Sequence, residues 1–207
     1  MRVALGIEYD GSSYCGWQFQ DGVPTVQDQV EQALSQVADS MVRVVTAGRT
    51  DTGVHATGQV IHFDTEVARS EYSWQRGATR YLPDDICVLW AMQVDESFHA
   101  RFSAIERHYR YIILNRAVRP AIERNRVTWE YRPLDVDLMR QAAKHLVGRH
   151  DFNAYRAVAC QAKSPVRDLR ELSVQRFGDY IVIEARADGF LHHMIRNIAG
   201  VLCSIGA

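Results

Sequence analysis

The chain has 207 residues, of which 47% are hydrophobic and 24% charged, and its formal net charge is −1. This length fits one large or two small domains, and this composition excludes intrinsic disorder and collagen-like sequence. No apolar run reaches the roughly 18 residues of a membrane-spanning helix, and the first residues lack the features of a signal peptide. The cysteines show no zinc-ligand spacing and are expected to be buried free thiols: Cys15, Cys87, Cys160 and Cys203. We therefore expect a cytoplasmic protein with no membrane segment and no metal site.

Charge is distributed unevenly along the chain. The 24 basic residues include only two lysines, Lys144 and Lys163, so arginine dominates. Residues 1–40 have a net charge of −5, whereas residues 99–132 hold eight arginines and have a net charge of +5. Arginine suits planar, bidentate contacts with phosphate. Because the local field decides attraction, a protein that is neutral overall can still bind RNA through a basic face.

The first half of the chain has the order β-loop-α-β-loop-β, followed by a further helix and strand. Alternating apolar residues predict strands, and apolar residues at helical spacing predict helices. We expect a strand over 2–9, a helix over 26–37, strands over 42–48 and 59–65, a helix over 71–82 and a buried strand over 86–94. Thr25 is the expected N-cap of the first helix, with Asp28 in the capping-box position.

The second half repeats this order. We expect strands over 107–115 and 127–132, a helix capped by Asp135 or Asp137 and ending at Gly148, a hairpin that turns at Gly178-Asp179 and an apolar helix over 192–206. The expected inward residues of the middle helix are Leu138, Met139, Ala142, Ala143 and Leu146. The fold class is α+β. Two halves of related topology, residues 1–104 and 105–207, are expected to share one mixed, mostly antiparallel sheet with a central cleft.

One loop concentrates reactive side chains. Residues 47–56 read AGRTDTGVHA, which places Asp51 between two glycines that permit tight turns. The nearby Arg49 would keep this carboxylate ionised, as a base or nucleophile must be. By spacing alone, an ordinary Asx turn is the favoured explanation of the loop. Nucleotide-binding glycine loops, zinc-enzyme motifs and the GxSxG elbow are absent, and an Asp/His hydrolase using Asp51 and His55 would leave the other motifs unexplained.

Four further motifs accompany this loop in a fixed order. They are YDGSSYCGWQ at 9–18, FHARFSA at 98–104, YRY at 109–111 and HHMIRN at 192–197. Together the five motifs resemble the tRNA pseudouridine synthase A family, from residue 2 to the end of the chain. The resemblance implies the pseudouridine synthase fold, with two ferredoxin-like halves. It also implies a homodimeric isomerase that needs no metal or organic cofactor. Its expected reaction converts uridine to pseudouridine in the anticodon stem-loop of tRNA, at about positions 38–40, after base flipping.

The resemblance also assigns roles to single residues. Asp51 matches the essential aspartate, Tyr109 the tyrosine that packs on the target base, and Arg196 the arginine that pairs with the aspartate. Arg49 matches the arginine that helps to extrude the base. Whether the carboxylate attacks C6, attacks C1′ or removes the ribose 2′ proton stays open. The sequence adds one argument for Arg196, because this residue lies in an otherwise apolar helix where an unpaired charge is costly.

The remaining expectations concern RNA contacts and chain length. Arg101, Arg107 and Arg110 are expected to contact phosphates, and His193 to contact RNA. A structural or phosphate-facing role is the favoured interpretation for the motif histidines: His55, His62, His192 and His193. The motif at 9–18 is expected to be structural and dimer-related. Family members continue with a last strand that lines the uracil pocket, so we expect the sequence to be a piece of a longer chain. The alternative function is a catalytically silent tRNA-binding or tRNA-folding module of the same fold.

Overall fold

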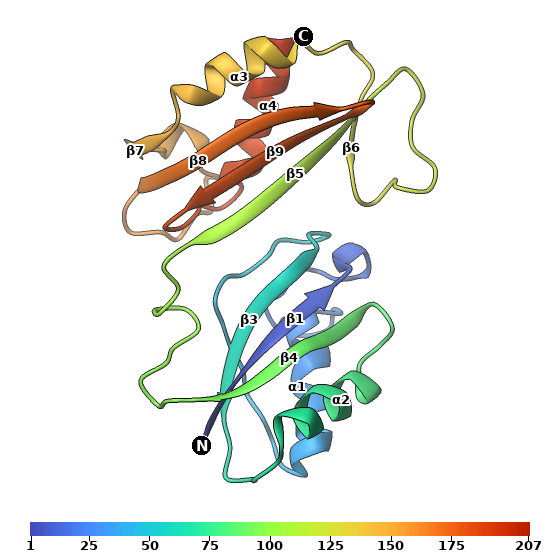
Figure 1. Ribbon diagram of the computed structural model, residues 1–207, viewed down its shortest axis with the longest axis vertical. Coiled ribbons are helices and arrows are strands. Elements are labelled where there is room, and N and C mark those ends of the chain that lie inside the picture. Colours follow the sequence, from blue (N-terminus) through green and yellow to red (C-terminus); the bar gives the residue numbers. More distant parts are fainter. The chain divides into compact units, whose positions relative to one another are not determined.

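The computed structural model describes residues 1–207, and the chain divides into two compact units, Met1–Ala104 (unit 1) and Ile105–Ala207 (unit 2). Each unit combines one β-sheet with two α-helices (Figure 1). The α+β class predicted from the sequence is therefore confirmed. The strands are hydrogen-bonded into two sheets, one within each unit. No helix has the length and apolar character that a membrane crossing requires.

Unit 1 has the order β-α-β-β-α-β. Its elements are β1 (Arg2–Tyr9), the short 3-10 helix η1 (Gly11–Ser13), α1 (Val26–Ala38), β2 (Val45–Thr46), β3 (Ala56–Asp64), α2 (Glu71–Tyr81) and β4 (Ile86–Val94). The strands lie in the order β2-β3-β1-β4, and each neighbouring pair is antiparallel. This is the ferredoxin-like arrangement expected for the first half.

Both helices of unit 1 pack on one face of its sheet (Figure 1). Val3, Leu5 and Ile7 are buried together in β1, because alternate residues of a strand share a face. From α2, Trp74 meets Phe63 of β3 edge to face, with the ring centroids 5.1 Å apart. The β1 strand thus runs through the centre of the core, and its last residue directly precedes the loop at 10–18.

Three sequence predictions for unit 1 are wrong in detail. The strand expected over 42–48 is only two residues long, because the Val42 and Val44 N–H groups donate to the Ser35 and Glu31 side chains of α1. Thr25 precedes α1 as expected, but no capping box forms and its buried hydroxyl has no hydrogen-bond partner.

The third correction concerns β4, which was expected to be buried. Its residues Leu89, Trp90 and Met92 are exposed. Trp90 lies across Gly6 of β1, where a Cβ atom would come within 2.1 Å of the indole nitrogen. The apolar residues at 86–94 therefore lie on both faces of β4, one packed in the core and one that reaches solvent.

Unit 2 repeats the β-α-β-β-α order and adds two short strands. Its elements are β5 (Arg107–Asn115), β6 (Thr128–Glu130), α3 (Val136–Lys144), β7 (Gly148–Asp151), the 3-10 helix η2 (Asn153–Tyr155), β8 (Val166–Phe177), β9 (Tyr180–Ala187) and α4 (Met194–Gly206). The sheet order is β6-β5-β9-β8-β7, and only the β5–β6 pair is parallel. The series β5, β9, β8 matches β1, β3, β2 of unit 1, so the two halves are related in topology.

The helix α3 differs from its prediction at two points. Asp135 caps it as expected, since its carboxylate accepts the N–H groups of Asp137 and Leu138. Leu138, however, is 46% exposed, so it does not belong to the core. Gly148 does not end the helix but begins β7, with a φ of +114° that favours glycine. The β8–β9 hairpin turns at Gly178 as predicted.

Candidate active site

Asp51 lies half-buried in the loop that joins β2 to β3, and Arg49 is exposed beside it. The base of this loop is anchored to β3, because the Gly48 carbonyl accepts a hydrogen bond from Gln59 Nε2 at 2.6 Å. A turn closes behind the carboxylate, where the Val54 N–H donates to the Asp51 carbonyl at 3.1 Å. The loop therefore presents Asp51 from a backbone that is tied down on both sides.

The YDGSSYCGWQ motif forms a second loop against the first. The Trp17 N–H donates to the Thr50 carbonyl at 3.0 Å, and His55 Nδ1 accepts the Gly11 N–H at 3.1 Å. Two motifs separated by about 40 positions in the chain thus form one structural group around Asp51. His55 thus contributes one of the bonds between the two loops.

The FHARFSA motif forms a compact turn next to β3. Buried His62 accepts the Ala100 N–H at Nδ1, 3.1 Å away, which requires the neutral form of that nitrogen. The His99 ring stacks on Phe102 with centroids 4.3 Å apart, and the Arg101 guanidinium lies 5.6 Å from the Phe102 ring centre. Arg101 is exposed, and these contacts hold the turn that carries it.

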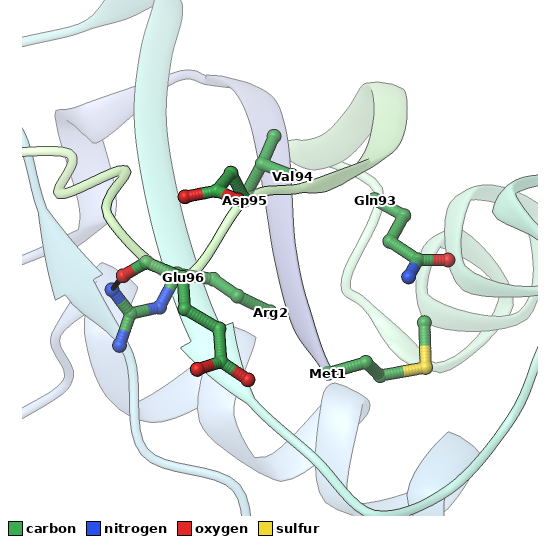
Figure 2. Close-up of a pocket in the computed structure, with 6 residues that line it drawn as sticks. All are labelled: Met1, Arg2, Gln93, Val94, Asp95 and Glu96. Atoms are coloured by element: carbon green, nitrogen blue, oxygen red, sulfur yellow. Dashed lines mark hydrogen bonds between the residues drawn. The ribbon is translucent and has the colours of Figure 1, made fainter.

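A surface pocket lies at the other end of β1 (Figure 2). Its lining residues are Met1, Arg2, Gln93, Val94, Asp95 and Glu96. Arg2 is already engaged, because it donates to the Asp64 carboxylate and to the Glu96 main-chain oxygen. The carboxylates of Asp95 and Glu96 would repel a phosphate. This pocket is therefore not the candidate site, which lies around the Asp51 loop.

In unit 2, Tyr109 is half-buried on β5. Its ring meets Phe190 edge to face, with centroids 4.9 Å apart and planes at 80°. Sequence reasoning did not single out Phe190. Its only local signal is an aromatic residue directly after the Asp188-Gly189 turn that follows β9. This contact fixes the ring orientation of Tyr109.

Strain marks the start of α4. His193 is its N-cap and has a φ of +61°, a left-handed conformation that is rare for a non-glycine residue and costs roughly 1–3 kcal/mol. The His192 and His193 rings lie 4.0 Å apart. Arg196 lies in the first turn and is exposed, so burial does not force it to find a partner as the apolar helix had suggested. Such strain is commonest at functional sites, which agrees with the role expected for this motif.

The two arginines of β5 have partners within unit 2. Arg107 Nη1 donates to the Asp188 carbonyl at 2.6 Å. Arg110 donates from Nε and Nη2 to Glu184 Oε1, its cross-strand neighbour on β9, at 2.9 and 2.6 Å. This hydrogen bond lowers the pKa of Glu184, so the carboxylate stays charged. A phosphate would therefore reach Arg110 only in competition with Glu184.

Comparison with known proteins identifies the family. A family profile described as tRNA pseudouridine synthase matches residues 6–103 and 142–207. The chain belongs to this family. A relative from Nitrosococcus oceani is 61% identical over 206 residues, which cover 100% of this chain and 80% of the relative. Relatives from Legionella pneumophila and Methylococcus capsulatus are each 56% identical over all 207 residues and are covered to 79% and 76%. All three are named tRNA pseudouridine synthase A.

Membership of the pseudouridine synthase family confirms the resemblance that the five motifs indicated, and it makes the chain an isomerase. The two matched segments contain the Asp51 loop, Arg101 and the motif with Arg196. Tyr109 falls between the segments, in a region that the full-length relatives nevertheless cover.

Proposed function

We propose that the protein converts uridine to pseudouridine in the anticodon stem-loop of tRNA, at about positions 38–40, with the target base flipped out of its stack. The observation that carries this proposal is the Asp51 loop, a half-buried carboxylate between glycines on a backbone tied to β3 and to a second motif. Such anchoring suits a group that must meet a reacting carbon in fixed geometry.

The proposed reaction replaces one bond between base and ribose with another and exchanges one proton with solvent. The N1–C1′ bond breaks, the base turns, and a C5–C1′ bond forms. The hydrogen on C5 leaves to solvent, and N1 takes up a proton, so the product is an isomer of the substrate. Asp51 is the proposed essential carboxylate, and its ionised form suits a nucleophile or a base.

The other residues have supporting roles in this proposal. Tyr109, oriented by Phe190, packs on the target base, and Arg196 is the proposed partner of the carboxylate. Exposed Arg49 helps to extrude the base. Phosphate and RNA contacts are proposed for Arg101, Arg107, Arg110 and His193. We also propose that the enzyme acts as a cytoplasmic homodimer, without metal or organic cofactor.

Tritium release from tRNA labelled at C5 of uridine tests the proposal directly, because only the isomerisation frees that hydrogen. We expect Asp51→Asn to abolish release while tRNA binding is largely kept, since phosphate contacts dominate binding. Asp84→Asn is the matched control: it removes an exposed carboxylate from the turn before β4 and leaves release at the wild-type level.

The alternative, a silent tRNA-binding or tRNA-folding module, predicts a different result. In that case the wild-type protein binds tRNA but releases no tritium. If Asp51→Asn releases tritium near the wild-type rate, the role of the aspartate is wrong although the protein is an active enzyme.

A further inference from the structure

The loop at 10–17 clasps the backbone on both sides of Asp51. The Trp17 N–H donates to the carbonyl of Thr50, directly before Asp51, at 3.0 Å. Two residues after Asp51, the Gly53 N–H donates to the Tyr14 carbonyl at 3.3 Å. Because the carboxylate sits on the residue between these bonds, a shift of the clasping loop would move it.

The side chains add a second connection at the same place. The Tyr9 hydroxyl lies 2.8 Å from Thr50 Oγ1, at hydrogen-bond distance. Tyr9 is the last residue of β1 and is 2% exposed, and its ring packs on buried Trp17 with centroids 5.8 Å apart. The rigid central strand of unit 1 is thereby linked, through one hydroxyl pair, to the neighbour of the carboxylate.

The contact between the loops is too close for larger residues. A Cβ atom at Gly16 would stand 2.7 Å from the Thr50 carbonyl oxygen, and one at Gly11 would stand 2.1 Å from the Val54 oxygen. Both distances are shorter than van der Waals contact, so only glycine permits this approach. The loops therefore meet backbone to backbone, which leaves little freedom for the chain around Asp51.

We propose that Tyr9 and Thr50 are positioning residues, whose hydroxyl pair sets the place of the Asp51 carboxylate. This inference rests on the proposed function of Asp51. Catalytic groups must be held to within about 0.5 Å of their productive geometry, and supporting hydrogen bonds usually supply that precision. The Tyr9–Thr50 pair joins β1 to the residue next to Asp51 through a side-chain bond.

The competing explanation is that the pair only stabilises the fold, and the chain offers an internal control for it. Tyr111 and Thr128 form a chemically identical hydroxyl pair in unit 2, with the oxygens 2.7 Å apart. Tyr111→Phe removes that bond and changes no residue of the Asp51 loop. Loss of stability in each variant can be compared through its free energy of unfolding.

The experiment measures kcat and KM for tritium release in the full chain carrying Tyr9→Phe, Thr50→Val, Thr50→Ser or Tyr111→Phe. We expect Tyr9→Phe and Thr50→Val each to lower kcat by about 10- to 100-fold with little change in KM, as small misplacements of a reacting group do. Thr50→Ser keeps a hydroxyl and should restore most of the lost kcat. The double variant with Tyr9→Phe and Thr50→Val should be no slower than the worse single variant, because both remove the same bond.

Two results would overturn the inference. One is a kcat loss in Tyr9→Phe and Thr50→Val no greater than that of Tyr111→Phe. The other is a Thr50→Ser protein that folds but is as slow as Thr50→Val. Failure of the proposed function looks different, because the wild-type protein itself would then release no tritium. A wrong role for Asp51 would show as turnover retained by Asp51→Asn, whatever the hydroxyl pair does.

Discussion

Gly16 and Gly22 share a left-handed backbone but differ in what surrounds them. Their φ angles are +86° and +76°, a region where a side chain is strained. Around Gly22 nothing would meet an added Cβ within 4 Å, whereas at Gly16 the Thr50 carbonyl would be 2.7 Å away. Alanine variants at these two glycines therefore separate the conformational cost of an alanine from its effect on the Asp51 loop.

For Gly22→Ala we predict a loss of about 1 kcal/mol in the free energy of unfolding, from the left-handed backbone alone, and a normal kcat. Gly16→Ala should lose more stability and also lower kcat, because the Thr50 carbonyl must move and Asp51 moves with it. Urea denaturation and tritium release measure the two quantities. Equal losses of stability with equal turnover in both variants would contradict this explanation.

At the scale of elements, the turn at 98–104 depends on β3 through a single buried histidine. His62 accepts the Ala100 N–H only when Nδ1 is unprotonated. Burial, the nearby Arg2 guanidinium and His99 lower the pKa of His62, and Asp64 opposes them more weakly. The folded protein thus binds a proton at this site less readily than the unfolded chain, whose histidine has a pKa of about 6.5.

This difference predicts a loss of stability in mild acid. Above about pH 6.5 His62 is neutral in both states; as the pH falls below that value, the unfolded chain takes up the proton first and the free energy of unfolding decreases. The decrease ends once the pH has passed the lowered pKa of the folded state. We expect His62→Gln to flatten this part of the pH profile, measured by urea denaturation. His145→Gln, at the exposed end of α3, serves as control, and a profile unchanged by His62→Gln would reject the prediction.

At the scale of the whole molecule, the net charge of −1 is the sum of opposite local charges. The basic segment 99–132 contributes β5, β6 and the connection between them, which carries exposed Arg119 and Arg124. If tRNA is bound through this local charge, its affinity should fall steeply with salt despite the neutral average, because each neutralised phosphate releases counterions.

Two double variants with the same change in net charge test this expectation. Arg119→Gln with Arg124→Gln should weaken tRNA binding and reduce the slope of log affinity against log salt by about one unit for each lost contact. Arg76→Gln with Arg80→Gln, on the exposed surface of α2, should leave affinity and slope unchanged. If the two double variants behave alike, net charge rather than the basic segment governs binding.

Much of this protein could be derived from the sequence alone, because the patterns that carry it are local. Alternating apolar residues identify β1 and β5, and helical spacing identifies α1 and α2, since side-chain direction repeats every two or 3.6 residues. The hairpin turn at Gly178 is equally local. The five ordered motifs were enough to recognise the family and to direct attention to Asp51.

The tertiary structure decided what depends on residues far apart in the chain. The strand expected over 42–48 shrank to β2 because Val42 and Val44 bond to α1, and β6 pairs with β5 in parallel. The contact of Phe190 with Tyr109 has no counterpart in any local pattern. The hydrogen bonds of the 10–17 loop to the neighbours of Asp51 also have no counterpart in a local pattern. The reason is that a periodic pattern shows which face of an element is buried but not what will lie against it.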